Sequence, residues 1–203
     1  MAKAKPLTGF DPKAPVSEIA PQIARIRLAE MYDWAGYVDN PYEVSGLHNL
    51  RIAAKRLRYT LEIFEDVLPP ACQGIADELS QIQDELGTVH DADVLIALLR
   101  LCLGSEDGGL AYEQALAQAG KQKGKGKTLL PPAMVAAVLN PQYAPSATER
   151  YGMEQLLLRQ QKVREQRYNA FRQHWHELQA RDFRREILDV LSSEEKDVTN
   201  IAS

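Results

Sequence analysis

Long apolar runs are missing from this sequence. No segment reaches the roughly 18 continuous apolar residues that a membrane-spanning helix needs. The opening segment, MAKAKPLTGFDPKAP, also lacks the apolar core of a secretory signal. These two absences predict a cytoplasmic protein with no membrane partner.

Cysteine is scarce as well. The chain contains only Cys72 and Cys102, which are far apart and lie among helix-forming residues. They form neither a CxxC redox pair nor the ligand set of a zinc site. We expect both to be reduced, buried small side chains, as is usual in the cytosol. His174 and His176 point to different sides of a helix, so we expect no metal site and no cofactor.

An excess of positive charge is also absent, because 24 lysines and arginines face 28 acidic residues and the net charge is −4. The overall field of such a chain does not draw it to nucleic acid or to any other polyanion. Anion binding must therefore come from local clustering of cations. We expect no specific nucleic-acid partner.

Strand-like alternation does not occur, whereas apolar residues recur at spacings of three and four along most of the chain. A chain of 203 residues with 45% hydrophobic content can form one domain with a substantial core. We predict an all-α fold, a helical bundle with long antiparallel helices, in a single domain over residues 16–191. Residues 1–15 are predicted to be a flexible lead-in and residues 192–203 a solvated tail. A loop rich in lysine, glycine and proline is predicted at about 120–146.

Proline, glycine and capping residues set the predicted helix limits. Pro69 ends the second helix, and Gly87 ends the third in the left-handed conformation. The Thr88 hydroxyl then caps a new helix, with Asp91 and Asp93 at the positive end of its dipole. The approximate predicted ranges are 17–38, 43–68, 73–86, 88–103, 110–119, 147–180 and 183–191.

The second predicted helix combines an apolar seam with a basic arc. The arc, called the cation row below, consists of His48, Arg51, Lys55 and Arg58, while Arg56 lies further round the helix. No acidic residue occurs between positions 43 and 62, so the counter-charge must be water, an acidic face of another helix or a ligand. The seam consists of Leu47, Leu50, Ala54, Leu57, Leu61, Phe64 and Leu68.

Two other predicted helices carry cations beside apolar residues. Arg164, Arg167 and His174 share one face of the long helix at 147–180. Arg27 lies within the apolar seam of the first helix, where its guanidinium must extend outwards or meet an anion. If these helices pack by their seams, their cations would line one bundle interior or groove.

Several interpretations of these cations stay open. They could be surface charges paired with glutamates of a neighbouring helix, an anion site, or a docking face for an acidic protein segment. A phosphohydrolase would need converging carboxylates around a metal or a positioned base, and Asp91 and Asp93 are spaced for helix capping instead. The four lysines between Lys121 and Lys127 suit either a solvated linker or a flexible segment that catches an anion.

The spacing of the basic residues on the second helix resembles a family signature. His48, Arg51, Lys55, Arg56 and Arg58 reproduce the pattern H-x-x-R-x-x-x-K/R-R-x-R of the CHAD family, the conserved histidine α-helical domain. The later stretch IQDELGTVHDADVL is similar to the second marker of that family, a leucine-glycine pair that leads into an aspartate-rich helix start. The resemblance covers about residues 43–103, with weaker agreement through the long final helix.

The resemblance implies a helical domain that binds inorganic polyphosphate in a basic groove and can associate with polyphosphate granules. Phosphate or sulfate would fit the same site. The residues expected to bind polyphosphate are the five of the motif. The supporting cations are Arg27, Arg164, Arg167 and His174. Some members are fused to a triphosphate-processing domain with an ExExK motif, which this sequence lacks. We therefore expect a stand-alone, non-enzymatic binding module without catalytic residues.

Two features depart from the family pattern. Members commonly carry two copies of the histidine-arginine motif, whereas one copy is intact here, and a homodimer could supply the missing half. Members also often have arginine just before the aspartate of the second marker, where this chain has His90. An unperturbed histidine is mostly neutral at neutral pH, so it makes a weaker charge contact.

Overall fold

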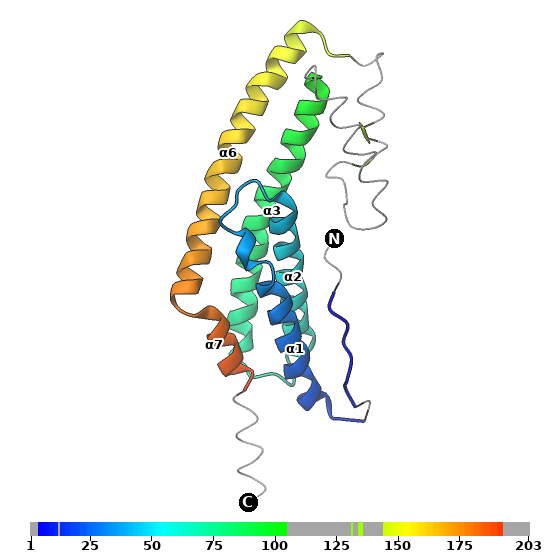
Figure 1. Cartoon of the computed structure of the whole chain (residues 1–203), viewed down its shortest axis with the longest axis vertical. Coiled ribbons are helices and arrows are strands. Elements are labelled where there is room, and N and C mark those ends of the chain that lie inside the picture. The colour runs from blue at the N-terminus through cyan, green and yellow to red at the C-terminus, as the bar shows by residue number, and fades with distance from the viewer. Residues whose placement is uncertain (1–3, 12, 105–130, 132–133, 136–143, 193–203) are drawn as a thin grey trace, which may run out of the picture. The chain divides into compact units, whose positions relative to one another are not determined.

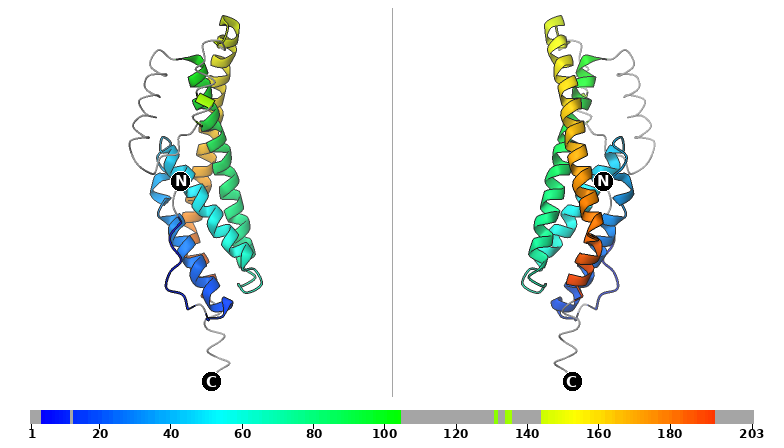
Figure 2. Two further views of the ribbon diagram at one scale, coloured as in Figure 1. Left: turned by 90° about the vertical axis from the view of Figure 1, so that its right-hand side faces the viewer. Right: turned by 90° about the vertical axis from the view of Figure 1, so that its left-hand side faces the viewer.

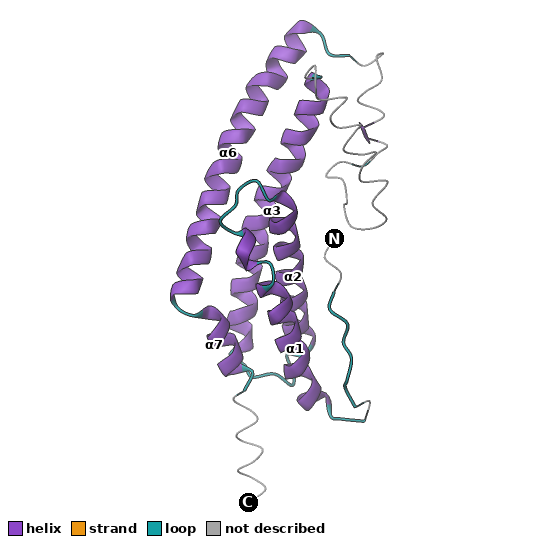
Figure 3. Ribbon diagram, viewed as in Figure 1, coloured by secondary structure: helices purple, strands orange, loops and turns teal. Residues whose placement is uncertain are grey.

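The computed structural model describes residues 4–11, 13–104, 131, 134–135 and 144–192 (Figure 1). Helices and loops make up these described residues, and no strand occurs among them (Figure 3). The predicted all-α class is therefore confirmed. The predicted helix at 110–119 and the lysine segment 121–127 lie outside the described residues. The helices are α1 (Val16–Tyr32), the 3-10 helix η1 (Ala35–Tyr37), α2 (Val44–Ile63), α3 (Cys72–Leu103), α6 (Ala147–Ala180) and α7 (Phe183–Val190).

The chain divides into two compact units, which we describe one at a time. The larger unit comprises Ala2–Gly87 and Asn169–Ser203, and the smaller unit comprises Thr88–Tyr168. Both α3 and α6 contribute one segment to each unit. The family-like motif on α2 therefore lies wholly in the larger unit, while the predicted single domain over residues 16–191 stays a prediction.

The core of the larger unit contains the predicted seam of α2. Burying each of these leucines contributes about 1.5–3 kcal/mol to folding, so the seam determines which side of α2 faces inwards. The helix α1 packs along α2, and α7 lies beside α1 (Figure 2). Arg25 of α1 donates a hydrogen bond to the carbonyl of Leu191, the residue that follows α7. Phe64 is only half-buried. The remaining seam residues, Leu47, Leu50, Ala54, Leu57, Leu61 and Leu68, are all buried.

Two predicted helix ends are wrong. The helix α1 ends at Tyr32 rather than at position 38, because the chain turns into η1, which still brings Val38 into the core. The helix α2 ends at Ile63 rather than at position 68. There the backbone tightens, because the N–H of Glu65 bonds to the carbonyl three residues earlier, and the following turns keep Leu68 buried.

The predicted break at Gly87 is also wrong, because α3 continues through it without interruption. Among the described glycines, positive φ occurs at Gly9 and Gly104 and not at Gly87. Thr88, Asp91 and Asp93 consequently lie inside a helix and not at its start. A continuous buried face outweighs the cost of about 1 kcal/mol for a helical glycine. That face consists of Ile75, Leu79, Ile82, Leu86, Val89, Ala92, Ile96 and Leu99.

Gly46, in the first turn of α2, provides a test of this packing. A Cβ atom at Gly46 would lie 2.5 Å from Cγ and 2.7 Å from Cβ of Tyr37, so an added methyl group would collide with η1. We expect Gly46→Ala to lower the free energy of unfolding by about 1–3 kcal/mol, measured by urea denaturation. Gly74→Ala on α3 is the matched control, because its Cβ meets nothing within 4 Å. Equal stability of the two variants would contradict this packing.

Candidate functional site

The cation row extends along one side of α2. At a rise of 1.5 Å per residue, the ten-residue interval from His48 to Arg58 covers about 15 Å. Lys55 is exposed, and the other three members are half-buried. The buried seam holds the helix in this rotation, so the row is a consequence of how α2 packs.

Arg51 lies against the backbone of α3 within the larger unit. A Cβ at Gly87 would be 3.4 Å from Nε and 3.7 Å from Nη2 of Arg51, so the guanidinium occupies the place of a side chain that glycine does not have. The Nε atom is buried without a hydrogen-bond partner, and Arg51 forms no ion pair within the described part of the chain. A buried donor without an acceptor costs about 1–3 kcal/mol, so the position of Arg51 lowers the stability of the fold.

Lys55 and Arg58 flank the half-exposed ring of Tyr59. Lys55 Nζ lies 5.2 Å and Arg58 Cζ 4.9 Å from the ring centroid, which is cation–π distance. Arg58 Nη1 is 3.4 Å from both Ser80 Oγ and Glu62 Oε1, and its Nε atom is buried without a hydrogen-bond partner. Both contacts are long, so Arg58 is only weakly held.

Two of the predicted cations pair instead with a buried carboxylate. Glu30 is 3% exposed and accepts hydrogen bonds from Arg27 and Arg56. Arg27 Nη1 is 2.8 Å from Glu30 Oε2 and also donates to the carbonyl of Lys5 at 3.0 Å. A glutamate of a neighbouring helix is thus the counter-charge of Arg56, while Arg51 and Lys55 have no such partner among the described residues.

His174 lies between two carboxylates of α3. Its Nε2 is 2.7 Å from Glu78 and its Nδ1 2.9 Å from Glu85. Partial burial lowers the pKa of His174, but the hydrogen bonds and charges of Glu85 and Glu78 outweigh this effect, so the pKa is raised. Once protonated, the ring donates from both nitrogens. The same cluster contains Arg181, which pairs with Glu78 at 2.7 Å.

The raised pKa of His174 predicts a pH dependence of stability. The stabilisation is fully present below the unfolded-state pKa of 6.5 and is lost as the pH rises through the higher folded-state pKa. We expect the free energy of unfolding to fall as the pH rises above about 6.5 and this ion pairing is lost, measured by urea denaturation. His174→Asn should reduce the slope, whereas the exposed His176→Asn should retain it. An unchanged slope in His174→Asn would contradict the assignment.

The predicted cations Arg164 and Arg167 belong to the smaller unit. Arg164 Nε pairs with Asp93 Oδ1 at 2.9 Å, and its guanidinium lies 5.4 Å from the ring centroid of Tyr168. Arg167 Nη1 donates to the carbonyl of Thr88 at 3.1 Å. Asp93 therefore forms an ion pair in the middle of a helix, where the sequence indicated a dipole contact. That these arginines share a groove with the cation row stays a prediction.

A family comparison agrees with the motif on α2. The family profile described as the CHAD domain matches residues 2–100. This region is a CHAD domain. The resemblance seen in the sequence is thereby confirmed for a region that includes α1, α2 and most of α3. No curated protein and no solved structure matches the chain.

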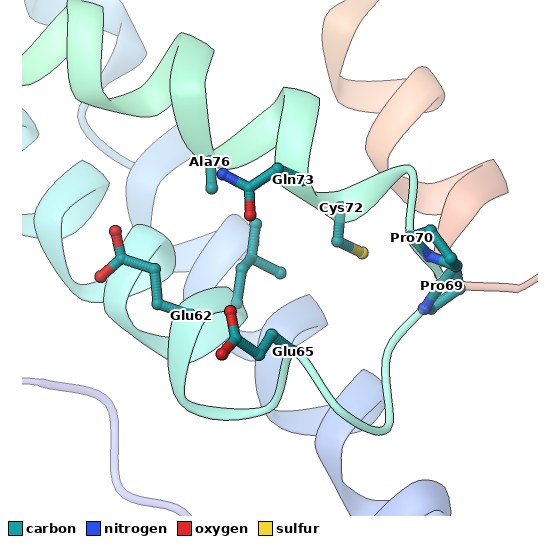
Figure 4. A pocket seen from close by; sticks show the side chains of 8 residues that line it. Glu62, Glu65, Pro69, Pro70, Cys72, Gln73 and Ala76 are labelled. Atoms are coloured by element: carbon teal, nitrogen blue, oxygen red, sulfur yellow. The ribbon is translucent and has the colours of Figure 1, made fainter.

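A small cavity of about 210 Å³ lies at the end of α2 in the CHAD domain (Figure 4). Two carboxylates, of Glu62 and Glu65, line it together with Cys72 and the two prolines that follow α2. This acidic lining disfavours an anion. Cys72 is a buried free thiol, as predicted, whereas Cys102 is half-buried, and burial raises the pKa of its thiol.

The described residues offer neither a membrane-spanning helix nor a metal site. None of their helices is long and apolar enough to cross a membrane. No group of three or more histidine, cysteine, aspartate and glutamate side chains is placed among them to hold a metal ion.

Four residues of the CHAD domain take part in the site and were missed by sequence reasoning. Glu30 is three residues after Arg27, which is the one local signal for its ion pair. Tyr59 follows Arg58 directly and lies four residues after Lys55, so the helical spacing could have placed its ring beside both cations. Ser80 and Gly87 come from α3, and no pattern within α2 could indicate them.

Proposed function

We propose that this protein binds inorganic polyphosphate along the cation row of α2, without converting it chemically. The guanidinium of Arg51, which has no hydrogen-bond or ion-pair partner among the residues that the structure describes, carries this proposal. Arg51 is half-buried and forms no ion pair within the described part of the chain, and a phosphate oxygen is the acceptor that its fork matches best.

The chemistry of the row suits a linear polyanion without bases. Polyphosphate repeats one kind of charged unit, so its recognition requires cations at regular intervals and no groups that read base edges. Arginine can hold two phosphate oxygens at once, and Lys55 acts as a compact point charge. His48 adds a hydrogen-bond donor at the start of the row. A ligand of this kind would lie along α2.

The other cations support the site less directly. Arg27, Arg56 and His174 already have carboxylate partners in the larger unit, so the proposal does not depend on them. Arg164 and Arg167, which belong to the smaller unit, remain supporting cations in the proposal. We also propose that the protein is cytoplasmic and associates with polyphosphate granules, with a second copy of the chain completing the groove.

Binding of polyphosphates of graded chain length tests the function. We expect the affinity to increase with chain length and to fall linearly with salt on logarithmic axes between about 50 and about 200 mM, because each cation that pairs with a phosphate releases counterions. Orthophosphate and polyglutamate are the controls. Polyglutamate tests the alternative of an acidic protein partner. Equal affinity for polyglutamate and polyphosphate, or no binding of any chain length at low salt, would overturn the proposal.

A further inference from the structure

We infer that Gly87 is a positioning residue for Arg51: the missing side chain makes the space in which the guanidinium is held for its ligand. This inference rests on the proposed function for its role in binding. Its structural part, the dependence of the Arg51 position on Gly87, can be tested without any ligand.

The backbone does not explain the glycine. Gly87 lies inside α3 and is not among the described glycines with positive φ, so an L-residue would fit the helix. Alanine there would stabilise the helix by about 1 kcal/mol relative to glycine. A glycine that lowers the helix stability at this point has to be explained by what lies next to it.

The neighbouring atoms give the explanation. The three atoms nearest to a Cβ at Gly87 all belong to Arg51, namely Nε at 3.4 Å, Nη2 at 3.7 Å and Cζ at 4.0 Å. Alanine would make an ordinary van der Waals contact with this group. A longer side chain would need the volume that the guanidinium fills, and the guanidinium would have to leave the helix surface.

The same arrangement recurs two helical turns away. Ser80 lies seven residues before Gly87, and Arg58 lies seven residues after Arg51. Ser80 Oγ is 3.4 Å from Arg58 Nη1. The antiparallel segments of α2 and α3 therefore place a small residue opposite each arginine of the row. The small residues of α3 leave room for both guanidiniums. The buried guanidinium of Arg51 is thereby placed before binding, which reduces the entropy that a ligand must overcome.

A set of variants tests the inference. We expect Gly87→Leu and Arg51→Ala to weaken polyphosphate binding by a similar factor, about tenfold or more, and the double variant to be no weaker than either one, because both changes remove the same interaction. Gly87→Ala should keep most of the affinity. Gly74→Leu, on the same helix with nothing within 4 Å of its Cβ, should bind like the wild type.

The position of Arg51 has its own readout. The Arg51 Nε–H signal in an NMR spectrum, assigned by its loss in Arg51→Lys, should exchange slowly in the wild type because this atom is buried. It should exchange quickly in Gly87→Leu, or in Gly87→Met if the leucine variant does not fold. Circular dichroism and urea denaturation of each variant report whether the fold is intact.

The two hypotheses fail in different ways. If Gly87→Leu and Gly87→Met keep slow exchange at Arg51 and normal affinity while Arg51→Ala loses affinity, the positioning role is wrong and the proposed function stands. If the Gly87 variants lose the slow exchange but neither they nor Arg51→Ala bind polyphosphate more weakly, Gly87 positions Arg51 and the proposed site is wrong.

Discussion

Arg51→Ala is expected to lower the affinity for polyphosphate by about 10- to 100-fold while leaving the free energy of unfolding equal to that of the wild type or higher. The loss of affinity follows from removing a charged fork that binds phosphate oxygens. The stability is preserved because the guanidinium has no hydrogen-bond or ion-pair partner to lose among the described residues. Titration with polyphosphate and urea denaturation measure the two quantities on the same sample.

A loss of affinity without a loss of stability separates a binding residue from a structural one. Arg51→Lys keeps the charge without the fork, so we expect an intermediate affinity. Arg172→Ala is the matched control, because this arginine is exposed and pairs with Asp39 at 2.6 Å. Its loss should leave binding unchanged. If Arg51→Ala binds as well as Arg172→Ala, the row does not hold the ligand through Arg51.

Glu30→Gln is expected to lower the free energy of unfolding by about 3 kcal/mol, because it leaves two guanidiniums side by side without their buried carboxylate. The value is at the lower end of the range for broken buried pairs, since Arg56 remains partly exposed to water. Urea denaturation measures the loss. Glu18→Gln, in the exposed first turn of the same helix, should cost at most about 1 kcal/mol.

A triple variant identifies the cause of that loss. Replacing Arg27, Glu30 and Arg56 together by methionine removes both the charges and the need to pair them. We expect it to be more stable than Glu30→Gln, because well-packed apolar residues often replace a buried ion cluster without loss. A triple variant as unstable as the single one would show that the contribution of Glu30 is packing and not charge.

The spacing of apolar residues predicted a helix well wherever the buried face and the residues that start or stop a helix indicate the same limits. The limits of α6 match the predicted range of 147–180, and the seam of α2 is buried except at Phe64. Gly87 shows where such reasoning fails. The local rule treats a glycine after a leucine as a helix end, but the buried face of α3 continues on both sides of it, and that tertiary contribution is not visible in a short window.

The site was predictable to the extent that it lies on one helix. The spacing of His48, Arg51, Lys55 and Arg58 follows from helical geometry alone. The group that neutralises each cation cannot be predicted in this way, because it comes from another helix. Glu30 reaches Arg56 only through the packing of α1 on α2, and the carboxylates around His174 are about ninety residues away in the sequence.

The position of the tryptophans makes the larger unit observable by itself. The chain has two, Trp34 and Trp175, and both belong to that unit. Trp175 is buried against Tyr32 and Phe171, so its emission should shift when this core opens. Far-ultraviolet circular dichroism instead reports on the helices of both units. Coincident melting curves would mean that the two units unfold together, whereas separate curves would show that the unit with the cation row can open without its neighbour.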